Sequence, residues 1–358
     1  MSTMEDATTN VIEEVDASSL PSKDANIKVS SSSKCNMNNY LNILGYILGV
    51  ITSYLGGILG WFGGKSNAEL NNQYQTLVTP SAVYFQYVWG LIFISEGFFA
   101  IAQCLPKYRE TPMVQKSIGC VYFLASSAQV AWTITFGYEL MIVAFVSMLL
   151  LCITLLFILY RQWTVVIEEM KKVNTSIRLG DIDESEADYS LTAPPPKPSY
   201  WLLRFPFAVH AGWISICTPL MLSVLLVSLN CGESIELWAA VICLPLLFGV
   251  CMGLLLREEP GAPSYVYPLT VAYGCLGICW ELYAPSQVIL ARHDESSISL
   301  TKNLSGFCGV CLIVVVVSRF SVLIMRDQCL KFKKKDDDDN LVQETIDEDE
   351  SDAYYVAA

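Results

Sequence analysis

Eight runs of about 20 mostly apolar residues divide the middle of this chain, separated by polar segments. Each run is long enough to cross the hydrocarbon core of a bilayer as a helix. Only Tyr138 separates the third run from the fourth, which predicts a tight helical hairpin. The pattern therefore predicts an all-α integral membrane protein with eight transmembrane helices. They lie at 41–62, 82–105, 117–137, 139–160, 207–229, 236–256, 264–283 and 303–325.

The polar segments divide the chain into five parts. Residues 1–38 and the basic-then-acidic residues 327–358 are predicted to be disordered ends, because they hold too little apolar surface to bury a core. Residues 39–163 hold the first four helices, and 200–326 hold the last four. Residues 164–199 begin with apolar positions at helical spacing, either an extension of the fourth helix or a short interfacial helix, and end as an acidic, Pro-rich linker.

The distribution of Lys and Arg predicts the orientation in the membrane. With eight spans and both ends cytosolic, the cytosolic segments carry 18 of these residues and the outer loops carry 3. Cytosolic segments near transmembrane helices are enriched in Lys and Arg. We therefore expect both termini in the cytosol, although the sequence does not indicate which membrane the protein occupies.

Composition excludes several classes of protein. The net charge is −13, and most of the acidic residues lie in the two ends and the linker, which argues against a nucleic-acid partner. Most of the 13 cysteines lie inside apolar runs, where Cys packs as a small hydrophobic residue. Cys308 and Cys311 have metal-site spacing but lack an accompanying His. We therefore expect the lipid bilayer as a partner, no metal and no required cofactor.

Small residues repeat every fourth position in the first run, at Gly45, Gly49, Ser53 and Gly57. This spacing lets two helix backbones approach closely. The pattern fits packing within the bundle, which we favour, or the face of a homo-oligomer.

Three charged or titratable residues lie inside the apolar runs at similar depth. At a rise of about 1.5 Å per residue, Glu96, His210 and Arg319 all fall in the cytosolic half of the membrane. Such residues are costly in hydrocarbon and mark functional sites. We expect Glu96 and Arg319 to form an intramembrane charge cluster that His210 can join. The alternative for Arg319 is snorkelling toward the headgroups.

A second group combines aromatic and amide side chains nearer the midplane or the outer side. Trp89, Gln129 and Trp132 lie within spans, while Trp280 and Glu281 lie where interfacial anchors are expected. Trp213 and His210 add a polar-edged aromatic segment to the fifth run. Aromatic faces with few polar groups are typical of ligand pockets in helix bundles. We therefore predict a ligand site formed by Trp89, Gln129, Trp132, His210 and Trp213.

The sequence contains no catalytic constellation. It has two His residues, His210 and His293, and the second falls in an outer loop. No nucleophile elbow, phosphate-binding loop or zinc-protease motif is present. We expect a protein that is not an enzyme.

Three motifs resemble the tryptophan-rich sensory protein, or translocator-protein (TspO/MBR), family. Residues 79–93 (TPSAVYFQYVWGLIF) are similar to its Pro…Phe-x-x-Val-Trp-x-x-Leu helix. Residues 129–136 (QVAWTITF) are similar to its Trp-containing third helix, and 206–215 (PFAVHAGWIS) to its fifth. The resemblance covers the first five helices, and the three further helices are similar to a longer, eight-helix branch.

The resemblance implies a helical membrane receptor or carrier whose relatives bind flat hydrophobic molecules such as tetrapyrroles and sterols. We expect this protein to bind a small hydrophobic ligand of that kind, and transport or sensing would build on that binding. One alternative is a secondary transporter for a polar or ionic solute that uses Glu96, His210 and Arg319. The other is a structural or partner-binding membrane protein.

Overall fold

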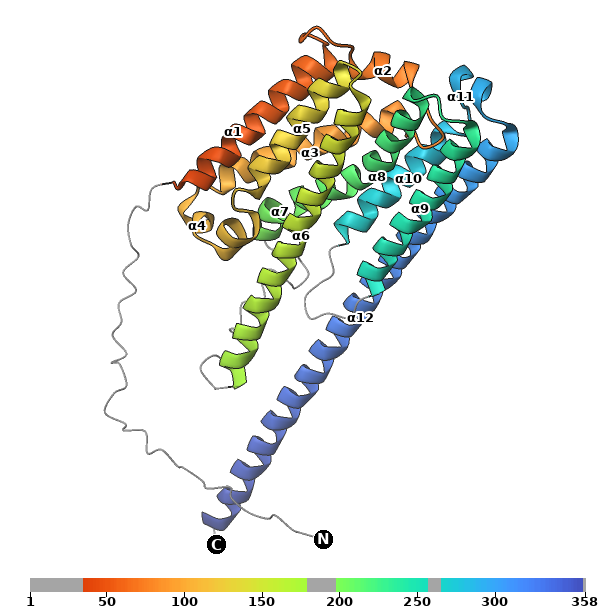
Figure 1. Ribbon diagram of the computed structural model, residues 1–358. Helices are drawn as coiled ribbons and strands as arrows, with labels where there is room; N and C mark the ends of the chain where they lie inside the picture. The colour runs from red at the N-terminus through yellow and green to blue at the C-terminus, as the bar shows by residue number, and fades with distance from the viewer. Residues whose placement is uncertain (1–34, 179–197, 257–264, 357–358) are drawn as a thin grey trace, which may run out of the picture. The chain divides into compact units, whose positions relative to one another are not determined.

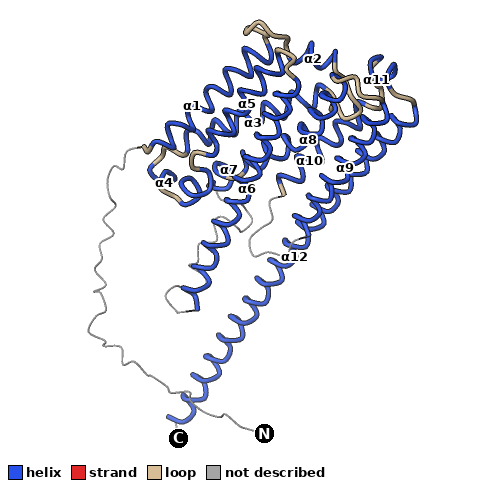
Figure 2. The backbone as a smooth tube through the Cα atoms, viewed as in Figure 1, coloured by secondary structure: helices blue, strands red, loops and turns tan. Residues whose placement is uncertain are grey.

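The computed structural model describes residues 35–178, 198–256 and 265–356. Within these residues the chain forms helices and loops, without strands (Figure 2). The predicted all-α class is confirmed. The helices are α1 (Met37–Thr52), η2 (Ser53–Ile58), α2 (Asn67–Gln73), α3 (Ala82–Ala102), α4 (Pro106–Arg109), η3 (Met113–Ile118), α5 (Val121–Gly137), α6 (Met141–Arg178), α7 (Pro198–Leu203), α8 (Phe205–Ser228), α9 (Glu233–Leu256), α10 (Val266–Glu281), α11 (Gln287–Arg292) and α12 (Glu295–Val356).

Six of these helices are long and apolar enough to cross a membrane. Their outward faces carry large apolar side chains, with Ile94, Ile101 and Leu246 all more than 60% exposed. A bundle in lipid is apolar on its outside, because the hydrocarbon cannot hydrogen-bond. The fold is therefore that of a multi-pass membrane protein. The six spans are Met37–Ile58, Ala82–Ala102, Met141–Lys172, Phe205–Ser228, Glu233–Leu256 and Glu295–Met325.

The predicted count of eight spans is not confirmed, because two helices are shorter than the apolar runs suggested. The run 117–137 loses its beginning to η3 and to a turn at Gly119, whose φ is +51°, so α5 has 17 residues. The run 264–283 yields α10, which has 16 residues.

Helix α8 lies at the centre of the packing (Figure 1). It contacts α3, α6, α9 and α10, and 61% of its most apolar window is buried. On one side α1, α5 and α6 pack in sequence, and on the other α10 packs against α12, which also contacts α9. The segment that carries His210 and Trp213 is thus the most enclosed span of the six.

The predicted helical hairpin is present between α5 and α6. Glu139 turns the chain with a φ of 58°, which is uncommon for a residue other than glycine. The loop after η2 holds this turn, because Lys65 Nζ lies 2.7 Å from Glu139 Oε2 and the Lys65 N–H donates to Gly137 O at 2.8 Å. The Lys65 ammonium and the Tyr74 hydroxyl lower the pKa of Glu139.

Two glycines of the repeat in the first run, Gly45 and Gly57, lie at contacts inside the bundle, whereas a Cβ on Gly49 would meet nothing within 4 Å. A Cβ on Gly45 would lie 3.1 Å from Ser126, and one on Gly57 would lie 3.5 Å from Thr133. Both partners belong to α5, which packs along α1. Packing within the bundle therefore accounts for these glycines, and a homo-oligomer stays an untested prediction.

Two helices extend beyond the predicted ends of their spans. The amphipathic segment after the fourth run continues α6 to Arg178. An extension of the fourth helix was one of the two predicted alternatives, and a short interfacial helix was the other. Helix α12 continues to Val356. The disorder expected for residues 327–358 stays a prediction. The stretch 326–356 contains neither Gly nor Pro, the two residues that disfavour a helix most. Residues 1–34 and the linker 179–197 lie outside the described residues.

Candidate functional site

Three helices place a buried polar network inside the bundle. Glu96 on α3 and His210 on α8 are 3% and 1% exposed. His210 Nδ1 lies 2.7 Å from Glu96 Oε1, and the hydroxyl of Tyr122 on α5 donates to Glu96 Oε2 at 2.9 Å. The direction of the hydrogen bond between His210 Nδ1 and Glu96 depends on the tautomer of the imidazole. The predicted meeting of Glu96 with His210 is therefore present.

Arg319 does not take part in this network. It lies on α12, one residue from Phe320, whose ring is 6.1 Å from that of Tyr265 at the start of α10. Glu96 lies on α3, which packs against α8. No ion pair joins Glu96 and Arg319 in the described part of the chain, so the predicted charge cluster of these two residues is corrected. Glu96 and Arg319 were predicted to meet because they lie at a similar depth, but two residues at one depth meet only when their helices are neighbours and their side chains face each other.

Aromatic side chains stack beside the network. The indoles of Trp89 and Trp132 are nearly parallel, at 9°, with centroids 6.2 Å apart. The His210 ring meets Trp89 edge-on at 5.9 Å, and Phe85 bridges Trp89 to Trp213. Four of the five predicted ligand-site residues thus come together. We define the aromatic cluster as Phe85, Trp89, Phe93, Trp132, Phe136, His210 and Trp213.

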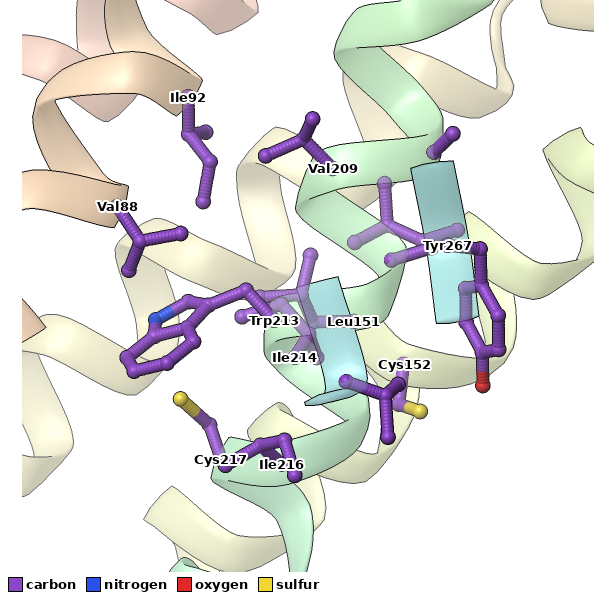
Figure 3. Packing of buried hydrophobic residues seen from close by; sticks show 14 of the residues in the cluster. Val88, Ile92, Leu151, Cys152, Val209, Trp213, Ile214, Ile216, Cys217 and Tyr267 are labelled. Carbon is purple, nitrogen blue, oxygen red and sulfur yellow. The ribbon is translucent and has the colours of Figure 1, made fainter. Parts of the chain in front are cut away.

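Trp213 is the most enclosed member of the aromatic cluster. It is fully buried, and its indole projects from α8 toward Val88 and Ile92 of α3 (Figure 3). Cys217, one turn further along α8, lies beneath the ring. Gly212 lets α10 pack close behind this segment, because a Cβ there would lie 2.8 Å from Tyr267 O and from Thr270 Cβ.

Three buried ring nitrogens in the aromatic cluster lack hydrogen-bond partners. They are Trp132 Nε1, His210 Nε2 and Trp213 Nε1. Buried polar atoms almost always have a partner, and an indole N–H left alone costs free energy. The cluster therefore offers two certain donors, the indole N–H groups, and one imidazole nitrogen to a molecule among its rings.

The remaining predicted residues lie apart from the aromatic cluster. Gln129 is buried on α5, but its Nε2 donates to Ser53 Oγ at 3.2 Å and so ties α5 to η2. Trp280 is 65% exposed at the end of α10, which fits the predicted interfacial anchor. Glu281 follows it and is only partly buried.

Sequence reasoning missed Tyr122 and the three Phe residues that complete the aromatic cluster, Phe85, Phe93 and Phe136. Tyr122 lies seven residues before Gln129, on the same face of α5, so helical spacing from that polar residue was the available signal. Phe136 lies four residues after Trp132 and stacks on it at 5.7 Å. In an apolar span such Phe residues are indistinguishable from those that face lipid.

Within the described residues no group of His, Cys, Asp and Glu side chains could hold a metal ion. The CxxC cysteines differ in burial, with Cys308 buried and Cys311 partly exposed.

Comparison with known proteins identifies the family. The sequence model of the TSPO-like protein family matches residues 39–318. This range begins within α1, contains every helix from η2 to α11 and includes most of the apolar part of α12, so the last helices fall within the match and not beyond it. No curated protein and no solved structure matches the chain. The chain belongs to the TSPO-like protein family and is an integral multi-pass membrane protein.

Proposed function

We propose that this protein binds a small, flat, hydrophobic ligand, a tetrapyrrole or a sterol, against the aromatic cluster. The observation that carries the proposal is the set of three unpartnered ring nitrogens beside stacked indoles. Flat apolar molecules gain from stacking on aromatic faces, and their few polar groups need donors in an enclosed site. Binding is the proposed role, with transport or sensing built on it.

The Glu96–His210 pair supports this site from one side. His210 touches both Glu96 and Trp89, so the carboxylate fixes the imidazole that the aromatic cluster contacts. A hydrogen bond to one ring nitrogen determines the tautomer and orientation of the other. We propose that Glu96 and Tyr122 are positioning residues that direct His210 Nε2 toward the ligand.

The alternative of a secondary transporter for a polar solute relied on Arg319 as a third charge. With Arg319 on α12 beside Tyr265 and Phe320, the remaining pair is small and is enclosed by apolar rings. Such surroundings favour a hydrophobic ligand.

Protoporphyrin IX titration of the detergent-solubilised protein tests the proposal. Its absorbance and the quenching of tryptophan fluorescence report binding. Trp132→Phe keeps a ring but removes an N–H, so we expect binding weaker by about 2- to 10-fold, the effect of one hydrogen bond. Trp280→Phe, at an exposed position, is the matched control and should bind as the wild type does. Equal affinity in both variants would place the site elsewhere.

We further propose that α5 and α10 also cross the membrane, giving eight spans with both termini cytosolic. Asn42 of α1 donates to Gly119 O before α5, and the Lys65 N–H after η2 donates to Gly137 O at the end of α5, so α5 is fixed to both ends of a spanning segment. Helix α10 starts beside Phe320 of α12 and ends near α3, where the Ser81 N–H donates to Gly277 O.

Single cysteines in a cysteine-depleted variant test this topology. Ser66→Cys and Ser296→Cys should react with an impermeant thiol reagent from outside, and Asp183→Cys, in the linker after α6, only after permeabilisation. The reason is the ratio of 18 cytosolic to 3 outer Lys and Arg residues that eight spans give. Labelling of residue 183 from outside, which six spans without α5 and α10 would give, or of residues 66 and 296 on opposite sides, would refute eight spans.

A further inference from the structure

A second site lies at the end of the bundle where α8 stops and α9 begins. The turn between them, together with Arg292 of α11, lines an open cleft of about 480 Å³. Figure 1 shows α11 at the same end as this turn. Ligand sites commonly measure roughly 300–1,000 Å³. None of the residues that line the cleft belongs to the aromatic cluster.

The wall of the cleft contains a buried carboxylate, one oxygen of which accepts no hydrogen bond. Glu236, in the first turn of α9, is 3% exposed, and its Oε2 accepts no hydrogen bond. His293 Nε2 lies 3.2 Å from that oxygen, but the contact lacks hydrogen-bond geometry, and both ring nitrogens are unpartnered. Buried carboxylates are costly unless they are paired and hydrogen-bonded. A group with N–H donors would complete the site.

The cleft also presents positive groups to an anion. Arg292 lines it and is fixed by a hydrogen bond from Nη1 to Gln75 O at 3.3 Å. The first backbone N–H groups of a helix have no partner within the helix and carry partial positive charge, and the cleft lies at the beginning of α9. Glu233 adds a second carboxylate. One acidic and one basic region in a single cleft match a small zwitterion.

We propose that this cleft binds a zwitterion of the phosphoethanolamine type, with its primary ammonium on Glu236 and its phosphate toward Arg292. The chemistry is shared by a free phosphoethanolamine and by the headgroup of an ethanolamine phospholipid. Helix α9 is a membrane span, so its first turn lies where headgroups are available. Glu236 requires N–H donors, so a quaternary choline headgroup does not replace ethanolamine.

Thermal unfolding of the detergent-solubilised protein tests the proposal with two soluble probes. Phosphoethanolamine should raise the midpoint, and phosphocholine should need at least about tenfold higher concentration for the same rise, because its ammonium has no N–H. Equal effects of the two probes, or none, would overturn the proposal. Bilayer nanodiscs then distinguish the sources. A lipid ligand predicts a higher midpoint in ethanolamine than in choline phospholipid, and a soluble ligand predicts equal midpoints.

Two variants test whether phosphoethanolamine binds in this cleft. Glu236→Gln and Arg292→Gln should each weaken the response to phosphoethanolamine by about tenfold or more. Glu295→Gln is the matched control, because it removes the same charge from an exposed position in the first turn of α12. An undiminished response in Glu236→Gln would refute the assignment. If that variant does not fold, the comparison of the two probes on the wild type still decides.

Discussion

Glu96→Leu should destabilise the detergent-solubilised protein by about 3–5 kcal/mol, and His210→Leu by a similar amount. Each change leaves one member of a buried pair without its hydrogen-bond partner, and breaking a buried pair has about this cost. The pair is 2.7 Å apart and at most 3% exposed. The free energy of unfolding, from denaturant titration followed by circular dichroism, is the quantity to measure.

The double variant tests whether Glu96 and His210 stabilise the protein through their contact with each other or independently. Because neither polar group of the pair is left without the other, Glu96→Leu with His210→Leu should recover much of the summed loss. Arg319→Leu is the control, since it lies on α12 and should add to Glu96→Leu without coupling. Additive losses for Glu96 and His210, or strong coupling of Glu96 to Arg319, would contradict the structure of the network.

Gly212→Ala should destabilise the protein by about 1–3 kcal/mol, the usual cost of overpacking. Its Cβ would lie 2.8 Å from the backbone oxygen of Tyr267, which belongs to α10 and cannot rotate away. Helices α8 and α10 would have to separate next to Trp213. The midpoint of thermal unfolding reports the loss.

Gly249→Ala provides the matched control for this substitution. Gly249 is exposed on α9, and a Cβ there meets nothing within 4 Å. Alanine favours a helix interior over glycine by about 0.5–1 kcal/mol, so this variant should be equally stable or slightly more stable. A loss at Gly249 as large as that at Gly212 would show that helix propensity, not α8–α10 contact, controls the result.

Depth counting along the sequence explains both a correct and an incorrect part of the site prediction. A rise per residue gives a position along the membrane normal, which correctly brought Glu96 and His210 to one level. It gives no information about which helices are neighbours or which way a side chain points. Arg319 shares that level but lies on a helix packed against α9 and α10.

The sequence identified the aromatic residues of the site more accurately than it identified which of them are neighbours. The Trp residues of the family motifs meet in the structure, because α3, α5 and α8 carry them toward one interior. Depth alone separated Trp89 and Trp132 from His210, yet Trp89 touches His210 at 5.9 Å. Indole and imidazole side chains are long enough to bridge neighbouring levels of a bundle.

The number of transmembrane spans could not be predicted reliably from the hydropathy of the sequence. Ser126, Gln129 and Thr133 of α5 are at most 5% exposed, so this helix holds polar groups that face protein and not lipid. A turn at Gly119 then shortens it to 17 residues. An apolar window cannot detect a helix boundary set by a turn, nor can it distinguish an enclosed polar face from an interfacial one.

Photocrosslinking with a diazirine-bearing sterol tests the central claim most directly. The protein, in detergent, is irradiated with the probe and digested, and the modified peptides are identified by mass spectrometry. The aromatic cluster predicts labels within residues 85–93, 129–136 and 207–217, and competition by protoporphyrin IX should reduce them. Labels confined to the exposed outer faces, unchanged by the competitor, would contradict a hydrophobic-ligand site inside the bundle.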